Sequence, residues 1–137
     1  MPERAPDLSE TLMHASRALR RRWWHALEEW DVSPHQARAL RTVCAQDQAR
    51  LSEVAAWLRI APRSATEVID SLEARGLVER QPDPDDRRAV LVVPTADGRQ
   101  MHTATEQARA AAAETLFGRL DPTERQQLGR LLRRLVD

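Results

Sequence analysis

Apolar residues recur at spacings of three and four along most of the chain, and this spacing is typical of amphipathic helices. The first such segment runs from Leu8 to Trp30 and predicts one long helix. A second helix is predicted to start at residues 33–36, where the sequence Ser-Pro-His-Gln combines a cap, a first-turn proline and a capping box. Residues 1–7 carry two prolines and mixed charge, and we expect them to fray.

The middle of the chain predicts two shorter helices joined by a tight connector. The first opens at Leu51-Ser52, and we expect Ser52 to be its N-cap. The second begins at Pro62 and ends before Gly76, a residue type that suits the left-handed conformation found after many helices. The apolar face of this second helix would consist of Ala65, Val68, Ile69 and Leu72. Two helices with so short a connector indicate a helix-turn-helix.

The periodicity changes between Leu77 and Thr95. Two β-type runs, Leu77–Gln81 and Ala89–Val93, flank a polar loop that holds two prolines, three aspartates and two adjacent arginines. A lone hairpin is marginally stable in water, so this one must pack against the helices beside it. A charged hairpin directly after a helix-turn-helix predicts a wing.

Two further helices complete the predicted fold. Thr95 can cap a long alanine-rich helix that ends near Gly118, and residues 121–124 repeat the cap, proline and capping-box pattern. Terminal helices with apolar stripes cannot bury those stripes alone, so we expect them to pack across a two-fold axis. The predicted fold class is mainly α with a small β-hairpin wing. Its parts are an N-terminal dimerisation helix (1–32), a winged helix-turn-helix DNA-binding lobe (33–94) and C-terminal dimerisation helices (95–137).

Composition narrows the range of functions. The chain has 137 residues with equal numbers of basic and acidic side chains, and every basic residue is arginine. A net charge of zero argues against non-specific coating of nucleic acid but leaves room for a local basic face. The sequence contains no signal peptide and no apolar run of membrane-spanning length, which predicts a cytoplasmic location.

Few residues indicate catalysis or metal binding. The four histidines are scattered, Cys44 is the only cysteine, and only four glycines are available for phosphate-binding loops. We therefore expect no enzyme activity, no metal site and no cofactor. Cys44 falls in an apolar helical pattern, which favours a buried thiol over a redox sensor.

Candidate DNA contacts lie at two places. Residues near the start of a recognition helix reach base edges in the major groove, and here those residues are Arg63, Ser64, Thr66 and Glu67. In the hairpin loop, arginines could enter the minor groove, with an aspartate holding an arginine fork in position. The candidates in the loop are Asp86, Arg87 and Arg88. The alternative for each segment is an ordinary charged surface, and the carboxylates of Glu67 and Asp70 count against DNA binding.

Three tryptophans, Trp23, Trp24 and Trp30, are concentrated in the first predicted helix. Core or dimer packing is the favoured interpretation. The alternative is that Trp24 or Trp30 lines a pocket for an aromatic ligand. Trp24, Trp30 and His14 are therefore the candidate ligand-binding residues.

Six short motifs span nearly the whole chain, at residues 32–36, 51–55, 68–78, 83–88, 95–98 and 120–124. Together they resemble the MarR family of bacterial winged helix-turn-helix transcriptional regulators. The resemblance implies a homodimer whose terminal helices form the interface and whose lobes bind a pseudo-palindromic operator. It places Asp86 and Arg88 on the family's wing-tip aspartate–arginine pair. It also implies release from DNA by small aromatic or anionic effectors, which bind between the dimer helices and the lobe.

The chain departs from the family pattern at three points. Pro62-Arg63 replaces a small polar helix start, Glu67 stands where a basic or polar residue is common, and Pro94 replaces a leucine. The sequence thus predicts a ligand-responsive, DNA-binding transcriptional regulator, acting as a repressor. Two alternatives remain: a winged-helix module for protein–protein interaction, and a small-molecule or redox sensor in which DNA contact is secondary.

Overall fold

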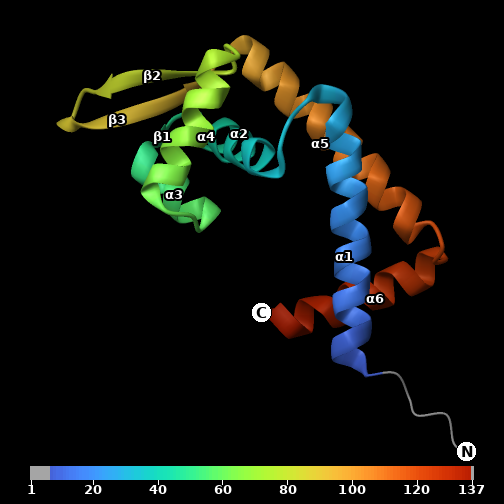
Figure 1. Ribbon diagram of the computed structural model, residues 1–137. Helices are drawn as coiled ribbons and strands as arrows, with labels where there is room; N and C mark the ends of the chain where they lie inside the picture. Colours follow the sequence, from blue (N-terminus) through green and yellow to red (C-terminus); the bar gives the residue numbers. More distant parts are fainter. Residues whose placement is uncertain (1–6, 137) are drawn as a thin grey trace, which may run out of the picture. The chain divides into compact units, whose positions relative to one another are not determined.

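The computed structural model describes residues 7–136 and has a mainly helical fold with a small antiparallel sheet (Figure 1). The helices are α1 (Leu8–Leu27), the short 3-10 helix η1 (Glu28–Trp30), α2 (Pro34–Gln46), α3 (Leu51–Leu58), α4 (Pro62–Ala74), α5 (Ala96–Phe117) and α6 (Pro122–Val136). The strands are β1 (Ala49–Arg50), β2 (Val78–Asp83) and β3 (Asp86–Pro94). The expected fraying of residues 1–7 falls, except for Asp7, outside the described residues.

The chain divides into two compact units. We call residues 27–107 the winged lobe, and residues 1–26 together with 108–137 the arm unit. In the arm unit, Arg109 lies over the ring of Trp23, 4.1 Å from the ring centroid. Arg125 donates hydrogen bonds to the Phe117 carbonyl (2.9 Å) and to the Glu114 carboxylate (2.7 Å), which fixes the turn between α5 and α6.

The helix starts follow the predicted local chemistry. The Ser33 hydroxyl accepts from the Gln36 amide at 3.1 Å, and the Gln36 side chain accepts from the Ser33 amide at 2.9 Å. Asp121 and Glu124 form the same reciprocal pair at the start of α6. The Thr95 hydroxyl accepts from an amide in the first turn of α5. Each cap satisfies backbone donors that a helix start leaves without partners.

Two local predictions were wrong, and one strand was not predicted. The first helix stops at Leu27 and tightens into η1, after which Asp31 takes a left-handed φ of 52°. Ser52 is not an N-cap, because α3 already begins at Leu51 and the Glu53 carboxylate accepts from the Arg50 amide at 3.3 Å. The strand β1 has no counterpart in the prediction, since two residues carry no periodic signal.

The sheet is larger than a lone hairpin. Its order is β1-β3-β2, with Ala49 paired to Val92 in β3 and β2 at an edge. Both hairpin strands run further than predicted, so only Pro84 and Asp85 remain as the turn. An edge strand with a bulge tolerates Pro82, and the register shifts between Pro82 and Asp83.

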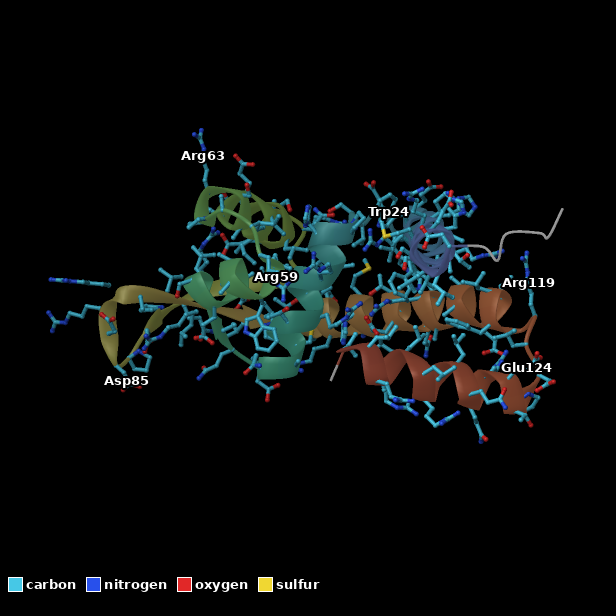
Figure 2. The ribbon with its side chains drawn as sticks, turned by 90° about the horizontal axis from the view of Figure 1, so that it is seen from below. Trp24, Arg59, Arg63, Asp85, Arg119 and Glu124 are labelled. Carbon is cyan, nitrogen blue, oxygen red and sulfur yellow. The ribbon has the colours of Figure 1, made fainter. Side chains whose placement is uncertain are left out.

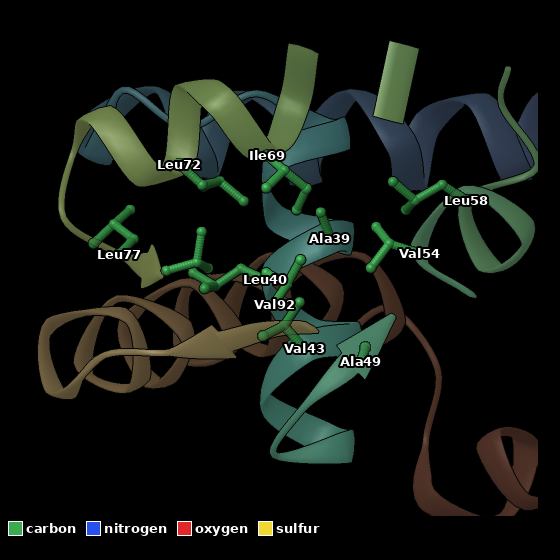
Figure 3. Packing of buried hydrophobic residues seen from close by; sticks show 11 residues of the cluster. Ala39, Leu40, Val43, Ala49, Val54, Leu58, Ile69, Leu72, Leu77 and Val92 are labelled. Atoms are coloured by element: carbon green, nitrogen blue, oxygen red, sulfur yellow. The ribbon is translucent and has the colours of Figure 1, made fainter. Parts of the chain in front are cut away.

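The core of the winged lobe lies between its helices and the sheet (Figure 3). The largest fully buried side chains are Leu40, Ile69, Leu72, Val43, Val54, Val78 and Val92. Burying each such side chain contributes roughly 1.5–3 kcal/mol. The predicted inward face of α4 is confirmed for three of its four residues, and Val68 is half-buried. This core fixes α4 and the wing on one rigid body.

Candidate nucleic-acid interface

Helix α4 presents a polar face opposite its buried stripe. Proline occupies its first turn, and its N-cap Ala61 has no side-chain hydrogen bond, so nothing from a cap side chain covers the start. Arg63, Ser64 and Glu67 are exposed, and Thr66 is half-buried with its hydroxyl donating to the Pro62 carbonyl. The structure therefore places the four predicted helix residues on one accessible end of α4.

Arg63 is the single cationic side chain of α4, whose residues are all described. Its side chain is 93% exposed, and Figure 2 shows it pointing away from the lobe. Its one ion pair in the described chain is a long contact of 4.0 Å from Nε to Glu67 Oε1. An exposed pair with this spacing along a helix is worth at most about 0.5 kcal/mol. Arg63 can therefore leave Glu67 for a stronger acceptor at little cost.

Asp70, which counted against DNA binding in the sequence, is neutralised by Arg80 of β2. Two terminal nitrogens of Arg80 donate to Asp70 (2.6 Å) and to Glu73 (2.9 Å), and the Arg80 amide also donates to Glu73. Burial by itself lowers the pKa of Arg80, but the hydrogen bonds to Asp70 and Glu73 outweigh it, so the net shift is upward. The three groups tie α4 to the wing, and the single positive charge of Arg80 offsets one of the two carboxylate charges on this surface.

Asp83, which the sequence places in the polar loop, is instead the last residue of β2 and is buried. Its side chain is 5% exposed, and Oδ2 accepts from Arg50 Nε at 3.0 Å and from an Arg50 terminal nitrogen at 2.9 Å. Its other oxygen accepts from the Asp85 amide at 2.9 Å, which closes the wing turn. Asp83 therefore holds the base of the wing tip to β1 and is not part of a charged loop.

The tip of the wing carries the two adjacent arginines at the start of β3. Arg87 and Arg88 are exposed, and neither guanidinium has an ion-pair partner among residues 7–136. The Asp86 carboxylate accepts from the backbone amide of Arg88 at 2.9 Å, so the contact the structure shows is to the backbone and not to the arginine fork. Figure 2 shows Asp85 at the end of the hairpin, beyond the helices of the lobe.

Net charge does not explain DNA binding by this lobe. Residues 27–107 contain fourteen carboxylates and ten arginines, so the lobe is acidic overall. Several of those arginines are already paired, including Arg41, Arg50 and Arg80. Attraction to a polyanion must therefore come from the few positioned cations on α4 and the wing.

Two further residues of this surface were missed in the sequence. Arg50 belongs to this surface because its side chain donates to Asp83. The only local hint of this residue in the sequence is Glu53, three positions later, which accepts from the Arg50 amide. Arg59 is exposed in the turn between α3 and α4 with a left-handed φ of 55° (Figure 2). Nothing in the sequence predicts that conformation, because glycine or asparagine is the usual residue there.

The three candidate ligand-binding residues are divided between the two units. His14 and Trp24 are exposed on α1 and belong to the arm unit, whereas Trp30 is half-buried and belongs to the winged lobe. Ten residues of helix separate His14 from Trp24 by about 15 Å along the axis of α1. Their roles remain a prediction.

The remaining chemistry of the described chain is limited. Burial raises the pKa of the Cys44 thiol, Arg99 partly opposes this shift, and Asp47 adds to it. Within residues 7–136, no group of three or more histidine, cysteine, aspartate or glutamate side chains is placed to hold a metal ion. Of the described helices, none combines the length and the apolar character that crossing a membrane requires.

Comparison with known proteins gives consistent matches. The MarR family model matches residues 32–90. The uncharacterized HTH-type transcriptional regulator Mb0904 of Mycobacterium bovis is 35% identical over 121 residues, which cover 88% of this chain and 82% of that protein. Wild-type MarR of Escherichia coli in its apo form has a TM-score of 0.89 at 23% identity, covering 98% of this chain and all of that one.

Two further solved structures share this fold. A cysteine-to-serine mutant of E. coli MarR, solved with operator DNA, has a TM-score of 0.79 at 24% identity and covers 95% of this chain and 94% of that one. BpsR of Bordetella bronchiseptica, whose DNA binding is regulated by 6-hydroxynicotinic acid, has a TM-score of 0.78 at 27% identity. The match covers 96% of this chain and 94% of that one. The family match, the regulator relatives and the exposed cations of a winged helix-turn-helix agree. The chain belongs to the MarR family and is a DNA-binding transcriptional regulator.

Proposed function

We propose that this chain binds a pseudo-palindromic operator as a homodimer and represses transcription until a small aromatic or anionic effector releases it. The observation that carries the proposal is the set of accessible cations on one acidic lobe. Arg63 stands at the start of α4, and Arg87 and Arg88 stand at the wing tip. In this arrangement Arg63 forks to a guanine edge and the wing arginines contact the minor groove or its phosphates.

The dimer is supported by the apolar surface of the arm unit. Large apolar side chains are exposed along both α1 and α6, and they are Leu8, Leu12, Met13, Trp24, Leu131, Leu132, Leu135 and Val136. A folded chain rarely leaves so many large apolar groups in water unless a partner covers them. Two copies packed through these helices would bury them and bring two winged lobes to successive turns of DNA.

Regulation by an effector is supported by the likeness to BpsR. Trp24, Trp30 and His14 stay our candidates for contacting such a molecule. The mechanism is a population shift, in which an effector that prefers a DNA-incompetent arrangement lowers DNA affinity by the ratio of its affinities for the two states.

The proposal is tested by titrating the protein against labelled DNA from its own promoter region at several salt concentrations. Each phosphate contact contributes about −0.9 to the slope of log affinity against log salt. In a dimer, Arg87→Ala removes two such contacts and should make the slope less steep by roughly two. Arg63→Ala should instead lower the ratio of the affinity for operator DNA to the affinity for unrelated DNA. Arg119→Ala is the matched control, since Arg119 is exposed in the turn between α5 and α6 (Figure 2).

DNA affinity that does not change with salt concentration, or an equal loss of DNA affinity in Arg87→Ala and Arg119→Ala, would refute the assigned interface. The acidic balance of the lobe favours a protein-binding module as the second candidate. That candidate gains if no promoter fragment binds while the dimer remains intact by sedimentation analysis.

A further inference from the structure

Glu67 is the one carboxylate of α4 that makes no short contact in the described chain. Its side chain is 72% exposed, and its ion pair with Arg63 is a long contact of 4.0 Å. The other two carboxylates of this helix, Asp70 and Glu73, accept hydrogen bonds from Arg80. Glu67 therefore presents available acceptor oxygens one helical turn after Arg63, on the accessible end of α4.

A carboxylate at this position selects strongly among the four bases. Its oxygens only accept hydrogen bonds, and nearby phosphates repel it. In the major groove, guanine presents two acceptors, thymine presents an acceptor and a methyl group, and adenine presents an acceptor beside its amino group. Cytosine presents an amino donor alone. Cytosine is therefore the base that meets Glu67 with a donor and with no acceptor of its own.

The spacing of Arg63 and Glu67 suits two neighbouring base pairs. Residues four apart stand on the same face of a helix, about 6 Å apart along its axis. Base pairs stack about 3.4 Å apart, a difference that two long side chains can bridge. The Thr66 hydroxyl competes poorly for base acceptors, because it already donates to the Pro62 carbonyl at 3.0 Å. The positive charge of Arg63 also offsets the negative charge that Glu67 brings towards the phosphates.

We infer that Glu67 is a specificity residue that accepts from the amino group of a cytosine in each operator half-site, next to the guanine bound by Arg63. The inference rests on the proposed function, because it requires α4 in the major groove. It also gives the carboxylate a second effect. Any other base at this position leaves Glu67 facing an acceptor, so the same side chain weakens binding to unrelated DNA.

The test is selection of bound sequences from a random library of duplex DNA by the full-length protein. We expect the selected motif to contain a cytosine beside a guanine. In Glu67→Gln the cytosine should change to adenine, because glutamine pairs with adenine through two hydrogen bonds, and the guanine should remain. Titration of single sites should show that wild type prefers cytosine to adenine at this position about tenfold and that the variant reverses the preference.

The matched control is Glu29→Gln. It removes the same charge from an exposed residue of η1, in the same lobe but outside α4 and the wing. We expect this variant to select the same motif as wild type. Both substitutions are at exposed positions and should leave the fold unchanged, which circular dichroism checks.

Three results would overturn the inference. The first is an identical motif for wild type and Glu67→Gln, which would leave Glu67 without a base contact. The second is an equal gain of affinity for every sequence in Glu67→Gln, since Glu67 would then only repel phosphates. The third is loss of the guanine from the motif while the cytosine stays, which would make Glu67 a positioning residue for Arg63. In all three cases the protein still binds DNA, so the proposed function stands. If wild type selects no motif, both fail.

Discussion

The ion pair between Asp83 and Arg50 gives a sharp prediction about the stability of the winged lobe. The two side chains differ greatly in exposure: Asp83 is 5% exposed and Arg50 is 44% exposed. Removing one partner of a pair costs most when the group left behind is buried and cannot return to water. The two single substitutions should therefore have unequal effects.

In Asp83→Ala the group left behind is Arg50, which is exposed enough to be hydrated. The variant also loses the hydrogen bond from the Asp85 amide that closes the wing turn. We expect a loss of about 1–3 kcal/mol in the free energy of unfolding. In Arg50→Ala the group left behind is a buried carboxylate, and the loss should be about 3–5 kcal/mol. The double variant should lose less than the sum, with a coupling of about 0.5–3 kcal/mol.

The measurement is urea denaturation at one fixed protein concentration, because the stability of the proposed dimer would depend on concentration. Arg88→Ala serves as the control, since it removes an exposed arginine without an ion pair and should change stability by less than about 0.5 kcal/mol. If Arg50→Ala costs no more than Asp83→Ala, burial of the carboxylate does not govern this pair and the reasoning is wrong.

Three further variants test other parts of the structure. Gly98→Ala should lower the free energy of unfolding by about 1–3 kcal/mol, because its Cβ would lie 1.9 Å from the Leu77 carbonyl oxygen. The control Gly129→Ala should be neutral or stabilising, because its Cβ would meet only a flexible arginine side chain. Equal losses of stability for the two variants would contradict the predicted clash at Gly98. Arg75→Ala removes the hydrogen bonds to the Trp30 and Asp31 carbonyls (2.9 and 2.6 Å). We expect the free energy of unfolding to fall by about 1–2 kcal/mol and the amides of residues 28–32 to exchange with solvent faster. Unchanged amide exchange would show that Arg75 does not hold this segment. The raised pKa of Cys44 predicts little thiolate at neutral pH. Alkylation of Cys44 in the folded protein should therefore be slower than in urea and should become faster as the pH rises. Fast alkylation at neutral pH, or loss of DNA binding in peroxide, would refute an inert thiol.

Much of the fold could be predicted because its signals are local. The capping boxes at Ser33 and Asp121, the cap at Thr95 and the left-handed Gly76, with φ of 72°, each involve residues within a few positions of one another. The inward face of α4 follows from periodicity in the same way. Strand β1 could not be predicted, because a two-residue strand exists only through its pairing with β3.

The residues of the candidate site could be chosen from the sequence, but which of their charges are paired and which are exposed could not. Arg63, Arg87 and Arg88 were identified from their places in the chain, and their exposure agrees with that choice. No local pattern indicated that Arg80 would pair with Asp70 and Glu73, or that Asp83 would be buried.

By itself, the sequence determined the helices, their starts and the winged helix-turn-helix order, because capping hydrogen bonds and apolar periodicity act between residues a few positions apart. The tertiary structure decided which charges remain available. Arg50 and Asp83 are 33 positions apart, and Arg41 and Glu106 are 65 apart. Whether such groups meet depends on how the core brings α2, α3, α4 and the sheet together, and that packing leaves the wing arginines without ion pairs in the described chain.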